Sequence, residues 1–336
     1  MGLGDISVAY IDILNKTMRA LGCDSDRMFS QFDLNEVKLA SPDARVSIPR
    51  YMRMGHLCIE QSGKAAFGLE MGRQMSLSQL GLAGMTALAA PDLIRACQCL
   101  ITFELLDNYN VRGASSFAIE GDCGIMNFYS ISPYNEYNHF IVDLVLSGWF
   151  HAVAQLTGRD DLVARVSFEF APPDYEADYK DYFGCEVLFS QPYNRLELKS
   201  GALEQRCPNG CISTYNLLYR YAQQELDIVQ HGLKFEQKVS RAISPMLNGN
   251  TPSLEQVAEQ LNMAPWTVRR RLIDEGVTFQ KVLNSTRSEL AQSYVKDTDL
   301  TLGEIAYLLG FGSATAFQRA FKRWVGVAPG IYRQRI

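Results

Sequence analysis

The sequence lacks the features that mark several common protein classes. Among its 336 residues, no stretch reaches the roughly 20 consecutive apolar residues that a membrane-spanning helix needs. Residues 1–10 contain no basic segment followed by an apolar one, which argues against a secretory signal. The chain also has no low-complexity run and no linker rich in glycine and serine. We therefore expect a folded cytoplasmic protein that makes no contact with a membrane.

Signatures of catalysis and of metal binding are also missing. No phosphate-binding loop, nucleophile elbow or dinucleotide-binding fingerprint occurs. The four histidines have no metal-ligand spacing and form no HExxH motif; they are His56, His139, His151 and His231. The sequence therefore predicts neither an enzyme nor a bound metal or other cofactor.

The eight cysteines all precede residue 212; they are Cys23, Cys58, Cys97, Cys99, Cys123, Cys185, Cys207 and Cys211. A cytosolic protein keeps its thiols reduced, and several of these cysteines lie in apolar helical segments. Neither Cys97-x-Cys99 nor the pair Cys207 and Cys211 has zinc-ribbon spacing. We expect inert thiols, with redox or metal sensing as the alternative.

Charge is distributed unevenly along the chain, whose net formal charge is −5. Residues 232–336 hold 14 Lys and Arg against 9 Asp and Glu, a net charge of +5. The 231 residues before them hold 18 against 28, a net charge of −10. An excess of +5 is common, so it is weak evidence by itself. A basic C-terminal domain on an acidic body nevertheless favours a polyanionic partner for that domain.

Residues 1–230 have the pattern of one α+β domain. Apolar periodicity and capping signals predict helices over residues 6–21, 49–61, 81–90, 91–106, 136–156 and 211–229. Alternating apolar residues predict strands over residues 116–120, 124–131, 165–170, 186–189 and 195–198, the first two joined by a hairpin turn at 121–123. We place the domain boundary near His231-Gly232, which divides the chain into residues 1–230 and 231–336.

Residues 231–336 have the pattern of an all-helical domain. Its predicted helices cover residues 234–246, 254–261, 265–274, 278–296, 302–309 and 313–325. Two capping boxes, Ser253 with Gln256 and Thr301 with Glu304, begin the second and fifth of these helices. Pro265 suits the first turn of the third helix.

A helix, a three-residue turn and a second helix occur twice in this domain. The corresponding apolar starts, Leu254 and Leu302, are 48 residues apart. In a helix-turn-helix motif the first helix braces the second, which enters the major groove of DNA. The predicted fold is therefore an α+β N-terminal domain followed by an all-α DNA-binding domain, with two helix-turn-helix motifs joined by a long helix.

The second helix of each motif separates into two faces. In residues 313–325 the inward positions recur at three- and four-residue steps, at Phe317, Ala320, Phe321 and Trp324. The outward positions are Thr315, Ala316, Gln318, Arg319, Lys322 and Arg323. In residues 265–274, Val268 and Leu272 point inward and the outward positions are Trp266, Thr267, Arg269 and Arg270. Arginine bonds guanine in a bidentate manner and an exposed tryptophan suits a thymine methyl group or a sugar, so we expect both outward faces to contact DNA.

The long helix predicted for residues 278–296 sets the distance between the motifs. Nineteen residues at about 1.5 Å each span roughly 28 Å. One turn of DNA rises about 34 Å, so one protomer can contact two successive major grooves on one face of the duplex. A solvated helix bundle with basic outer faces is the alternative interpretation.

A resemblance to a known family covers residues 232–332. It is most specific in the runs 302–313, 317–324, 326–329 and 332–333, which are similar to the signature of the AraC/XylS transcription regulators. The resemblance implies base contacts from Trp266, Arg269 and Arg270 in the first recognition helix, and from Thr315, Gln318 and Arg319 in the second. It also implies contacts with the DNA backbone near Ser313 and Lys322. One departure is Ala264-Pro265, where these proteins often have a serine cap worth about 1 kcal/mol.

The N-terminal domain resembles one branch of this family. The matching segments are 47–51, 68–72, 81–84 and 91–93, and the branch has an arabinose-binding-type N-terminal domain, as in the ornithine-utilisation regulators. The resemblance implies a domain other than a cupin barrel, and it does not identify arabinose as the ligand. It further implies an activator that works on promoter DNA with RNA polymerase in the bacterial nucleoid.

An acidic domain of this size is expected to sense a small molecule, to dimerise, or both. The helix over residues 211–229 carries an apolar and aromatic seam, and its dimerisation candidates are Tyr215, Leu218, Tyr219, Ala222 and Leu226. The alternative is that this seam packs on its own domain. For an effector site the candidates are residues 97–109, His139, Trp149 and Tyr193, although such residues more often belong to the core.

Two other functions fit part of the pattern. Some DNA-alkylation repair proteins combine a similar double motif with a cysteine methyl acceptor, but they need a Cys-His pair, which this sequence lacks. A pure interaction adaptor would bind no specific duplex. We therefore expect a ligand-responsive, sequence-specific DNA-binding activator that forms a homodimer and is not an enzyme.

Overall fold

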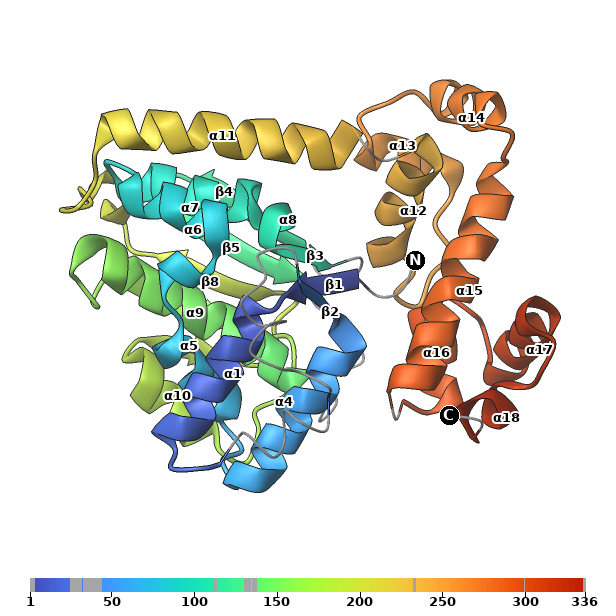
Figure 1. The fold of residues 1–336 in the computed structure, drawn as a ribbon, viewed down its shortest axis with the longest axis horizontal. Coiled ribbons are helices and arrows are strands. Elements are labelled where there is room, and N and C mark those ends of the chain that lie inside the picture. Colours follow the sequence, from blue (N-terminus) through green and yellow to red (C-terminus); the bar gives the residue numbers. More distant parts are fainter. Residues whose placement is uncertain are drawn as a thin grey trace.

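The computed structural model describes residues 4–24, 32, 44–110, 114–129, 134, 138–231, 234–298 and 300–334. An α+β domain is followed by a smaller all-helical domain (Figure 1). The helix α11 (Ile212–His231) lies along one side of the first domain and leads toward the second. The predicted fold class is confirmed.

The elements of the N-terminal domain mix helices and strands. Its other helices are α1 (Ala9–Ala20), α4 (Ile48–Ser62), α5 (Phe67–Gln74), α6 (Gly81–Ala89), α7 (Leu93–Thr102), α8 (Glu104–Asp107), α9 (His139–Thr157) and α10 (Glu176–Phe183), with short 3-10 helices η1 (Leu77–Gln79) and η2 (Ala202–Glu204). Its strands are β1 (Gly4–Ser7), β2 (Arg45–Ser47), β3 (Asn108–Asn110), β4 (Ala114–Glu120), β5 (Cys123–Tyr129), β6 (Val163–Ser167), β7 (Glu186–Leu188) and β8 (Asn194–Leu198).

The C-terminal domain is built from helices alone within the described residues. They are α12 (Phe235–Met246), α13 (Leu254–Gln260), α14 (Pro265–Asp274), α15 (Phe279–Asp297), α16 (Leu302–Leu308), α17 (Ala314–Val325) and α18 (Pro329–Gln334). Each predicted helix is present within two residues of its expected ends. Only α18 is absent from the prediction.

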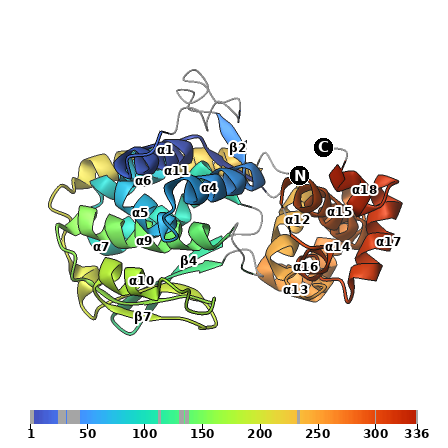
Figure 2. The same ribbon diagram turned by 90° about the horizontal axis from the view of Figure 1, so that it is seen from below.

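A five-stranded sheet has the order β4-β5-β8-β6-β7. Neighbouring strands in it are antiparallel, except for the parallel pair β6 and β7. The hairpin predicted around residues 121–123 joins β4 and β5, with Gly121 at a positive φ of 66° in its turn. The helix α9 contacts β5 and β8 on one side and α5 on the other. Figure 2 shows these layers, with α1 and α4 beyond α5.

The helix α9 is the centre of the N-terminal core. It is long and apolar enough to cross a membrane by composition, but most of it is buried inside the domain. The glycines of α5 explain its close packing, because a Cβ atom on Gly72 would lie 2.1 Å from Oγ of Ser147. A Cβ atom on Gly68 would lie 2.6 Å from Cβ of Asp143. We therefore interpret α9 as a core helix.

A second, small sheet with the order β2-β1-β3 is absent from the prediction. Its strands have only three or four residues, which is too short for apolar alternation to stand out. Arg45 fastens this sheet to α8, because its guanidinium donates to the main-chain oxygens of Leu106 at 2.7 Å and Asp107 at 2.9 Å.

The helix predicted for residues 91–106 is divided in two. The side chain of Asp92 caps α7 by accepting a hydrogen bond from the main chain of Arg95 at 3.0 Å. Phe103 then leaves helical geometry, with φ −100° and ψ 6°, and its ring is completely buried against Tyr219. The turn α8 follows in a new direction. The prediction also lacks α5 and α10, which have eight residues each.

Candidate DNA-binding interface

Both helix-turn-helix motifs begin with the predicted capping boxes. The hydroxyl groups of Ser253 and Thr301 each accept a hydrogen bond from the main-chain N–H three residues later, at 3.2 Å. The side chains of Gln256 and Glu304 accept bonds from the main chains of Ser253 and Thr301 in return. These reciprocal bonds fix where α13 and α16 start.

The turn of each motif passes through one residue in the left-handed region. These residues are Asn262, with φ 52°, and Gly310, with φ 67°. A Cβ atom at Gly310 would lie 2.0 Å from the main-chain oxygen of Asn250, so this position requires glycine. The turns therefore set the angle at which α14 and α17 leave the motifs.

The first recognition helix, α14, buries Val268 and Leu272 completely. Its opposite side presents the predicted DNA contacts: Trp266, Arg269 and Arg270 are exposed and Thr267 is half-buried. Trp266 is 67% exposed, which leaves a large apolar surface facing solvent. The N-cap Ala264 provides no side-chain hydrogen bond, so α14 begins without a side-chain cap.

The second recognition helix, α17, has a sharper division. It buries Phe317, Ala320 and Phe321, and Trp324 packs its ring 5.9 Å from that of Phe311. The hydroxyl group of Ser313 caps the helix by accepting a bond from the main chain of Ala316 at 3.2 Å. The predicted contacts are all exposed: Ser313, Thr315, Ala316, Gln318, Arg319, Lys322 and Arg323.

The helix α15 connects the two motifs as one unbroken element of 19 residues. Arg287 lies in α15, and its buried side chain donates to the main-chain oxygens of Leu309 at 2.8 Å and Gly310 at 3.0 Å. It also donates to Oγ1 of Thr251 at 2.6 Å and lies over the ring of Phe311. Arg287 therefore ties the turn of the second motif to α15.

Two further side chains hold the motifs in place. Glu275, after the first recognition helix, accepts bonds from the main chains of Phe235 at 2.7 Å and Glu236 at 2.8 Å. Its carboxylate therefore caps the N-terminus of α12. Arg333 donates to the main-chain oxygens of Val295 at 3.1 Å and Leu300 at 2.7 Å, which anchors α18 to the end of α15.

These anchoring roles were not predicted from the sequence, although one signal for them was present. Arg287 falls on the apolar stripe of α15 between Leu283 and Leu290, where a charged residue must find internal partners. Glu275 and Arg333 carry no such signal, because their partners lie about 40 residues away in the chain.

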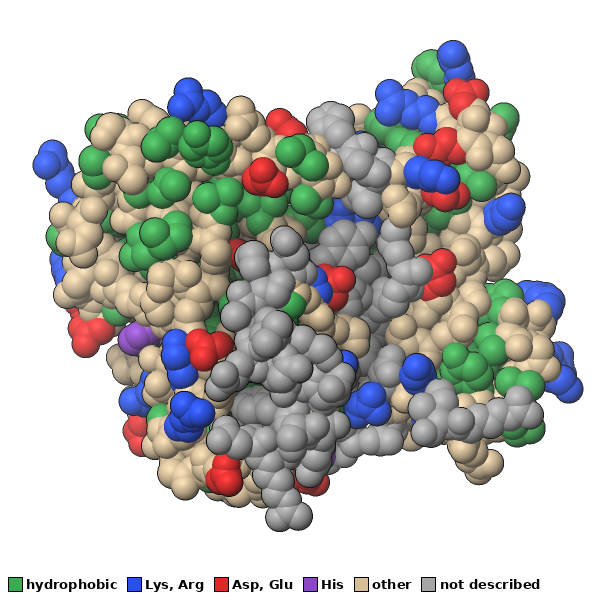
Figure 3. Space-filling view, in the orientation of Figure 1, with side chains coloured by type: hydrophobic (Ala, Val, Ile, Leu, Met, Phe, Trp, Pro, Cys, Tyr) green, Lys and Arg blue, Asp and Glu red, His purple; other side chains and the backbone are tan. Residues whose placement is uncertain are grey.

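The charges on the recognition helices are available to a ligand. Arg269, Arg270, Arg319 and Lys322 are exposed and make no ion pair with any other described residue. In Figure 3 basic side chains project from the two ends of the C-terminal domain, over α14 and α17. Two exposed, positively charged helices at opposite ends of α15 form a surface suited to a polyanion.

The seam proposed for dimerisation lies mainly inside the domain. Tyr215, Ala222 and Leu226 are buried, Leu218 is half-buried, and Tyr219 packs on Phe103. Tyr215, Ala222 and Leu226 belong to the core of their own domain, and Leu218 packs against that core. Tyr219 remains 36% exposed.

The candidate effector residues are brought together only in part. Residues 100, 101, 104, 107 and 108, together with Trp149, line one cavity of the N-terminal domain. His139 stacks on Phe170, and Tyr193 lies under the guanidinium of Arg195, so these two belong elsewhere.

The eight cysteines are free, and four of them are buried. Burial raises the pKa of Cys58 and of Cys97 to about 12. Cys211 differs, because hydrogen bonds from Ser213 and Thr214 lower its pKa to about 6. Among the described residues, no group of three His, Cys, Asp or Glu side chains could hold a metal ion.

Comparison with known proteins agrees with this geometry. Residues 22–207 match the family model described as the arabinose-binding domain of AraC transcription regulator, N-term, and residues 257–335 match a helix-turn-helix domain. The chain belongs to the AraC family of transcription regulators. An AraC-family protein of this kind is a DNA-binding transcription regulator, and the match to the arabinose-binding domain confirms the predicted branch.

Relatives are similar over nearly the whole chain. The ornithine utilization regulator of Pseudomonas aeruginosa is 28% identical over 334 residues, covering 98% of this chain and 96% of the relative. The regulator VirS of Mycobacterium tuberculosis is 23% identical and covers 94% and 92%. The crystal structure of CdpR from Pseudomonas aeruginosa is 21% identical, covers 97% and 98%, and has a TM-score of 0.48. The ornithine utilization regulator and VirS are transcription regulators, which points away from an enzyme.

Proposed function

We propose that this AraC-family protein is a ligand-responsive activator whose protomer contacts two successive major grooves of promoter DNA. The observation that carries the proposal is the placement of two exposed, basic recognition helices at opposite ends of α15. Because Arg287 and Arg333 brace α15 against the second motif, the two helices keep a fixed separation. The 19 residues of α15 span roughly 28 Å, comparable with the ~34 Å rise of one turn of DNA.

The exposed side chains divide into two kinds of contact. Arginines can bond guanine edges in pairs, so Arg269, Arg270 and Arg319 are the proposed guanine contacts, with Thr315 and Gln318 on neighbouring bases. Trp266 is the proposed apolar contact with a thymine methyl group. Contacts with the sugar-phosphate backbone are assigned to the remaining positions, which are the half-buried Thr267 and the exposed Ser313, Ala316, Lys322 and Arg323.

The experiment begins with selection of genomic fragments that the full chain binds. Methylation interference on a selected fragment should show two clusters of essential guanines per protomer, about one helical turn apart. Arg319→Ala should lower affinity for that fragment by roughly 5- to 150-fold, as expected for a bidentate base contact of ~1–3 kcal/mol, and should relax preference at one base pair.

Lys199→Ala is the matched control, because it removes one exposed positive charge from the N-terminal domain. Lys199→Ala should leave the affinity for the selected fragment unchanged. If Arg319→Ala weakened binding to random DNA as much as binding to the selected fragment, Arg319 would have only a charge role.

We also propose that the protein forms a homodimer through the outer face of α11. Apolar side chains there follow the 4-3-4 spacing of a coiled-coil seam, at Leu217, Tyr221 and Ile228, with Gln224 completing the series. Leu217 is 44%, Tyr221 53% and Ile228 65% exposed. Hydrophobic side chains are visible over α11 in Figure 3.

The charges beside this seam favour a second copy in antiparallel orientation. Arg220 and Asp227 flank the seam on the same side and are exposed. In a two-fold antiparallel pair, Leu217 of each copy meets Ile228 of the other, and Arg220 faces Asp227. The seam is therefore complementary to itself, as a symmetric interface requires.

Light scattering at micromolar concentration tests the dimer. The wild-type chain should have twice the monomer mass, and Leu217→Glu with Ile228→Glu should be monomeric. Ile212→Glu, at an exposed position off the seam, is the control and should stay dimeric. Arg220→Asp should weaken the dimer and Arg220→Asp with Asp227→Arg should restore it; a monomeric wild-type chain would refute the proposal.

Residues 1–230 are then the sensing and dimerisation domain, and residues 231–336 are the DNA-binding domain. We further propose RNA polymerase as a partner at the promoter, a small-molecule effector, and action in the cytoplasm on nucleoid DNA. The family match to transcription regulators supports these roles. The proposed function includes no catalytic step.

A further inference from the structure

A cavity lies in the N-terminal domain between the small sheet and the helices α4, α7 and α9. Its volume is about 90 Å³, several times the roughly 10–15 Å³ that one water molecule needs, so it has room for a small organic molecule. Most of its wall is apolar or aromatic, with Leu100, Phe128, Leu144 and Trp149 among the lining residues. Such a wall suits the apolar body of an organic molecule.

One end of the cavity is acidic. Glu104 and Asp107 both line it, and they stand three residues apart on the single turn α8, so they share a face. Ser115 donates hydrogen bonds to Glu104 from its side chain and its main chain. Burial, and then the charges of Asp107 and Glu104, raise the pKa of Tyr10, which also lines the cavity. The two carboxyl groups and a phenol therefore meet at this end.

Three polar atoms at the same cavity have no hydrogen-bond partner among the described residues. They are the hydroxyl of Tyr51, Oδ2 of Asp107 and Oδ1 of Asn108. Tyr51 is only 1% exposed, so water does not compensate its hydroxyl from outside. A buried polar group without a partner costs about 1–3 kcal/mol. Three polar atoms without hydrogen-bond partners around one cavity indicate a ligand that forms hydrogen bonds with them.

We propose that this cavity binds a small organic cation, an amine with an apolar body, whose ammonium group is held by Glu104 and Asp107. An ammonium donates up to three hydrogen bonds and accepts none, which matches carboxylate and amide oxygens. The aromatic ring of Tyr10, whose phenol is near both carboxyl groups, can add cation–π attraction. The effector role of this amine rests on the proposed ligand-responsive function, whereas the binding itself does not.

The charge balance of the wall favours a simple amine over an amino acid. Burial raises the pKa of Glu104 and of Asp107 to about 7, although the positive charge of Arg45 offsets part of the rise at Asp107. No basic side chain is among the described residues that line the cavity. The nearby Arg45 is exposed, and its guanidinium bonds to main-chain oxygens of α8. An α-carboxylate would therefore have no cationic partner in this wall.

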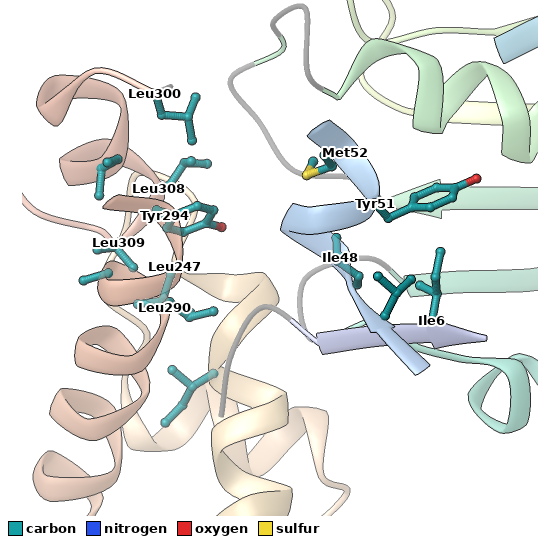
Figure 4. Packing of buried hydrophobic residues seen from close by; sticks show 14 of the residues in the cluster. Ile6, Ile48, Tyr51, Met52, Leu247, Leu290, Tyr294, Leu300, Leu308 and Leu309 are labelled. Atoms are coloured by element: carbon teal, nitrogen blue, oxygen red, sulfur yellow. The ribbon is translucent and has the colours of Figure 1, made fainter. Parts of the chain in front are cut away.

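The cavity wall also faces the DNA-binding domain. Ile48 and Tyr51 of α4 line the cavity, and α4 contacts α15. Figure 4 shows Tyr51 pointing into the N-terminal domain, while Leu290 and Tyr294 of α15 lie across from α4. Buried residues on both sides form one continuous hydrophobic cluster. A ligand that shifts α4 therefore acts directly on the helix that joins the two DNA-binding motifs.

Calorimetric titration of the full-length protein, without DNA and at about pH 8, tests the site. The probes are hexylamine and phenethylamine, with hexanol and hexanoate as matched neutral and anionic molecules. Both amines should bind in saturable fashion, and the alcohol and the acid should bind at least tenfold more weakly. Equal binding of hexanol and hexylamine, or no binding of either amine, would overturn the proposal.

Variants locate the binding. Glu104→Gln with Asp107→Asn should weaken amine binding at least tenfold, while Glu120→Gln with Asp160→Asn removes two exposed acids elsewhere and should leave it unchanged. Ala152→Leu fills the cavity without changing charge and should also abolish binding, so the test survives if the acid variant fails to fold. Unchanged binding in Ala152→Leu would place the amine outside the cavity and refute the proposal.

A parallel measurement of DNA affinity separates the two proposals. If the amine binds and alters affinity for the selected fragment, its effector role is supported. If the amine binds but the protein shifts no DNA, the site stands and the proposed function fails.

Discussion

Asn262 and Gly310 occupy the same position in the two helix-turn-helix motifs, and both adopt left-handed backbone geometry, with φ 52° and 67°. They are 48 residues apart, the same offset that separates Leu254 from Leu302. Their surroundings differ, because a Cβ atom at Gly310 would strike the main-chain oxygen of Asn250 at 2.0 Å. The duplication is therefore conserved in backbone geometry and not in residue type.

The two turns should respond differently to substitution. Gly310→Ala combines a left-handed backbone, which costs a side chain about 1–2 kcal/mol, with the clash against Asn250. We expect the free energy of unfolding of the C-terminal domain to fall by about 2 kcal/mol or more, and its Tm by roughly 8 °C or more. Asn262→Gly is the control and should change stability by less than about 1 kcal/mol. Calorimetry that showed equal effects would contradict this account of the turns.

Arg287 should stabilise the domain without contacting DNA. Arg287→Met leaves the main-chain oxygen of Leu309 without its side-chain donor, and an unsatisfied buried group costs about 1–3 kcal/mol. It also removes one of two donors to the main-chain oxygen of Gly310, which still accepts from Oγ1 of Thr251 at 3.2 Å. Urea unfolding should therefore show a loss of about 1–3 kcal/mol. Arg323→Met at an exposed position is the comparison, with an expected change within about 0.5 kcal/mol. Similar losses in both variants would disprove the bracing role.

Cys211 should be the most reactive thiol of the chain. It is exposed, and hydrogen bonds from Ser213 and Thr214 lower its pKa to about 6, so it is largely a thiolate at neutral pH. The buried thiols have raised pKa values and stay protonated. Brief treatment with iodoacetamide followed by mass spectrometry should find Cys211 modified first. Faster modification of Cys97, which is 1% exposed, would contradict the structure.

Asp143 should make stability depend on pH. It is completely buried, with Tyr179 donating to Oδ1 at 2.9 Å, and burial raises its pKa to about 7. The folded chain therefore holds a proton that the unfolded chain releases between about pH 4 and 7. The free energy of unfolding from this group falls as pH rises through that window, by up to about 4 kcal/mol.

Asp143→Asn removes this dependence. The free energy of unfolding of the variant, relative to that of the wild type, should therefore increase from pH 5 to pH 8. Urea unfolding of both proteins at the two pH values measures this difference. Burial lowers the pKa of His139 and of His151, which gives the opposite slope, but both are present in the two proteins and cancel in the difference. A constant difference between the proteins would show that Asp143 is ionised throughout.

The C-terminal domain was predictable because its signals are local. Capping boxes, Pro265 at the start of α14 and Gly326 at the end of α17 lie within a few residues of the boundaries that they set. Apolar spacing alone separated the buried face of α17 from its exposed face. The exposure of Trp266 followed from the same spacing.

The N-terminal domain was less predictable because its decisive contacts join distant segments. The small sheet pairs residues 4–7 with residues 45–47 and 108–110, and no local pattern announces three-residue strands. The seam of α11 was visible, but sequence could not decide whether Ala222 and Leu226 met their own domain or a partner. The acidic end of the cavity lies within residues 97–109, yet only the fold brings Tyr51 and Trp149 to it.

The helix α4 lies between the cavity and α15, and this has a consequence for how the protein responds to the amine concentration in a cell. If the amine changes affinity for the operator by some factor, the operator changes affinity for the amine by that same factor. Operator-bound molecules then respond to a different amine concentration from molecules free in solution. The promoter itself thereby sets the threshold at which its regulator responds.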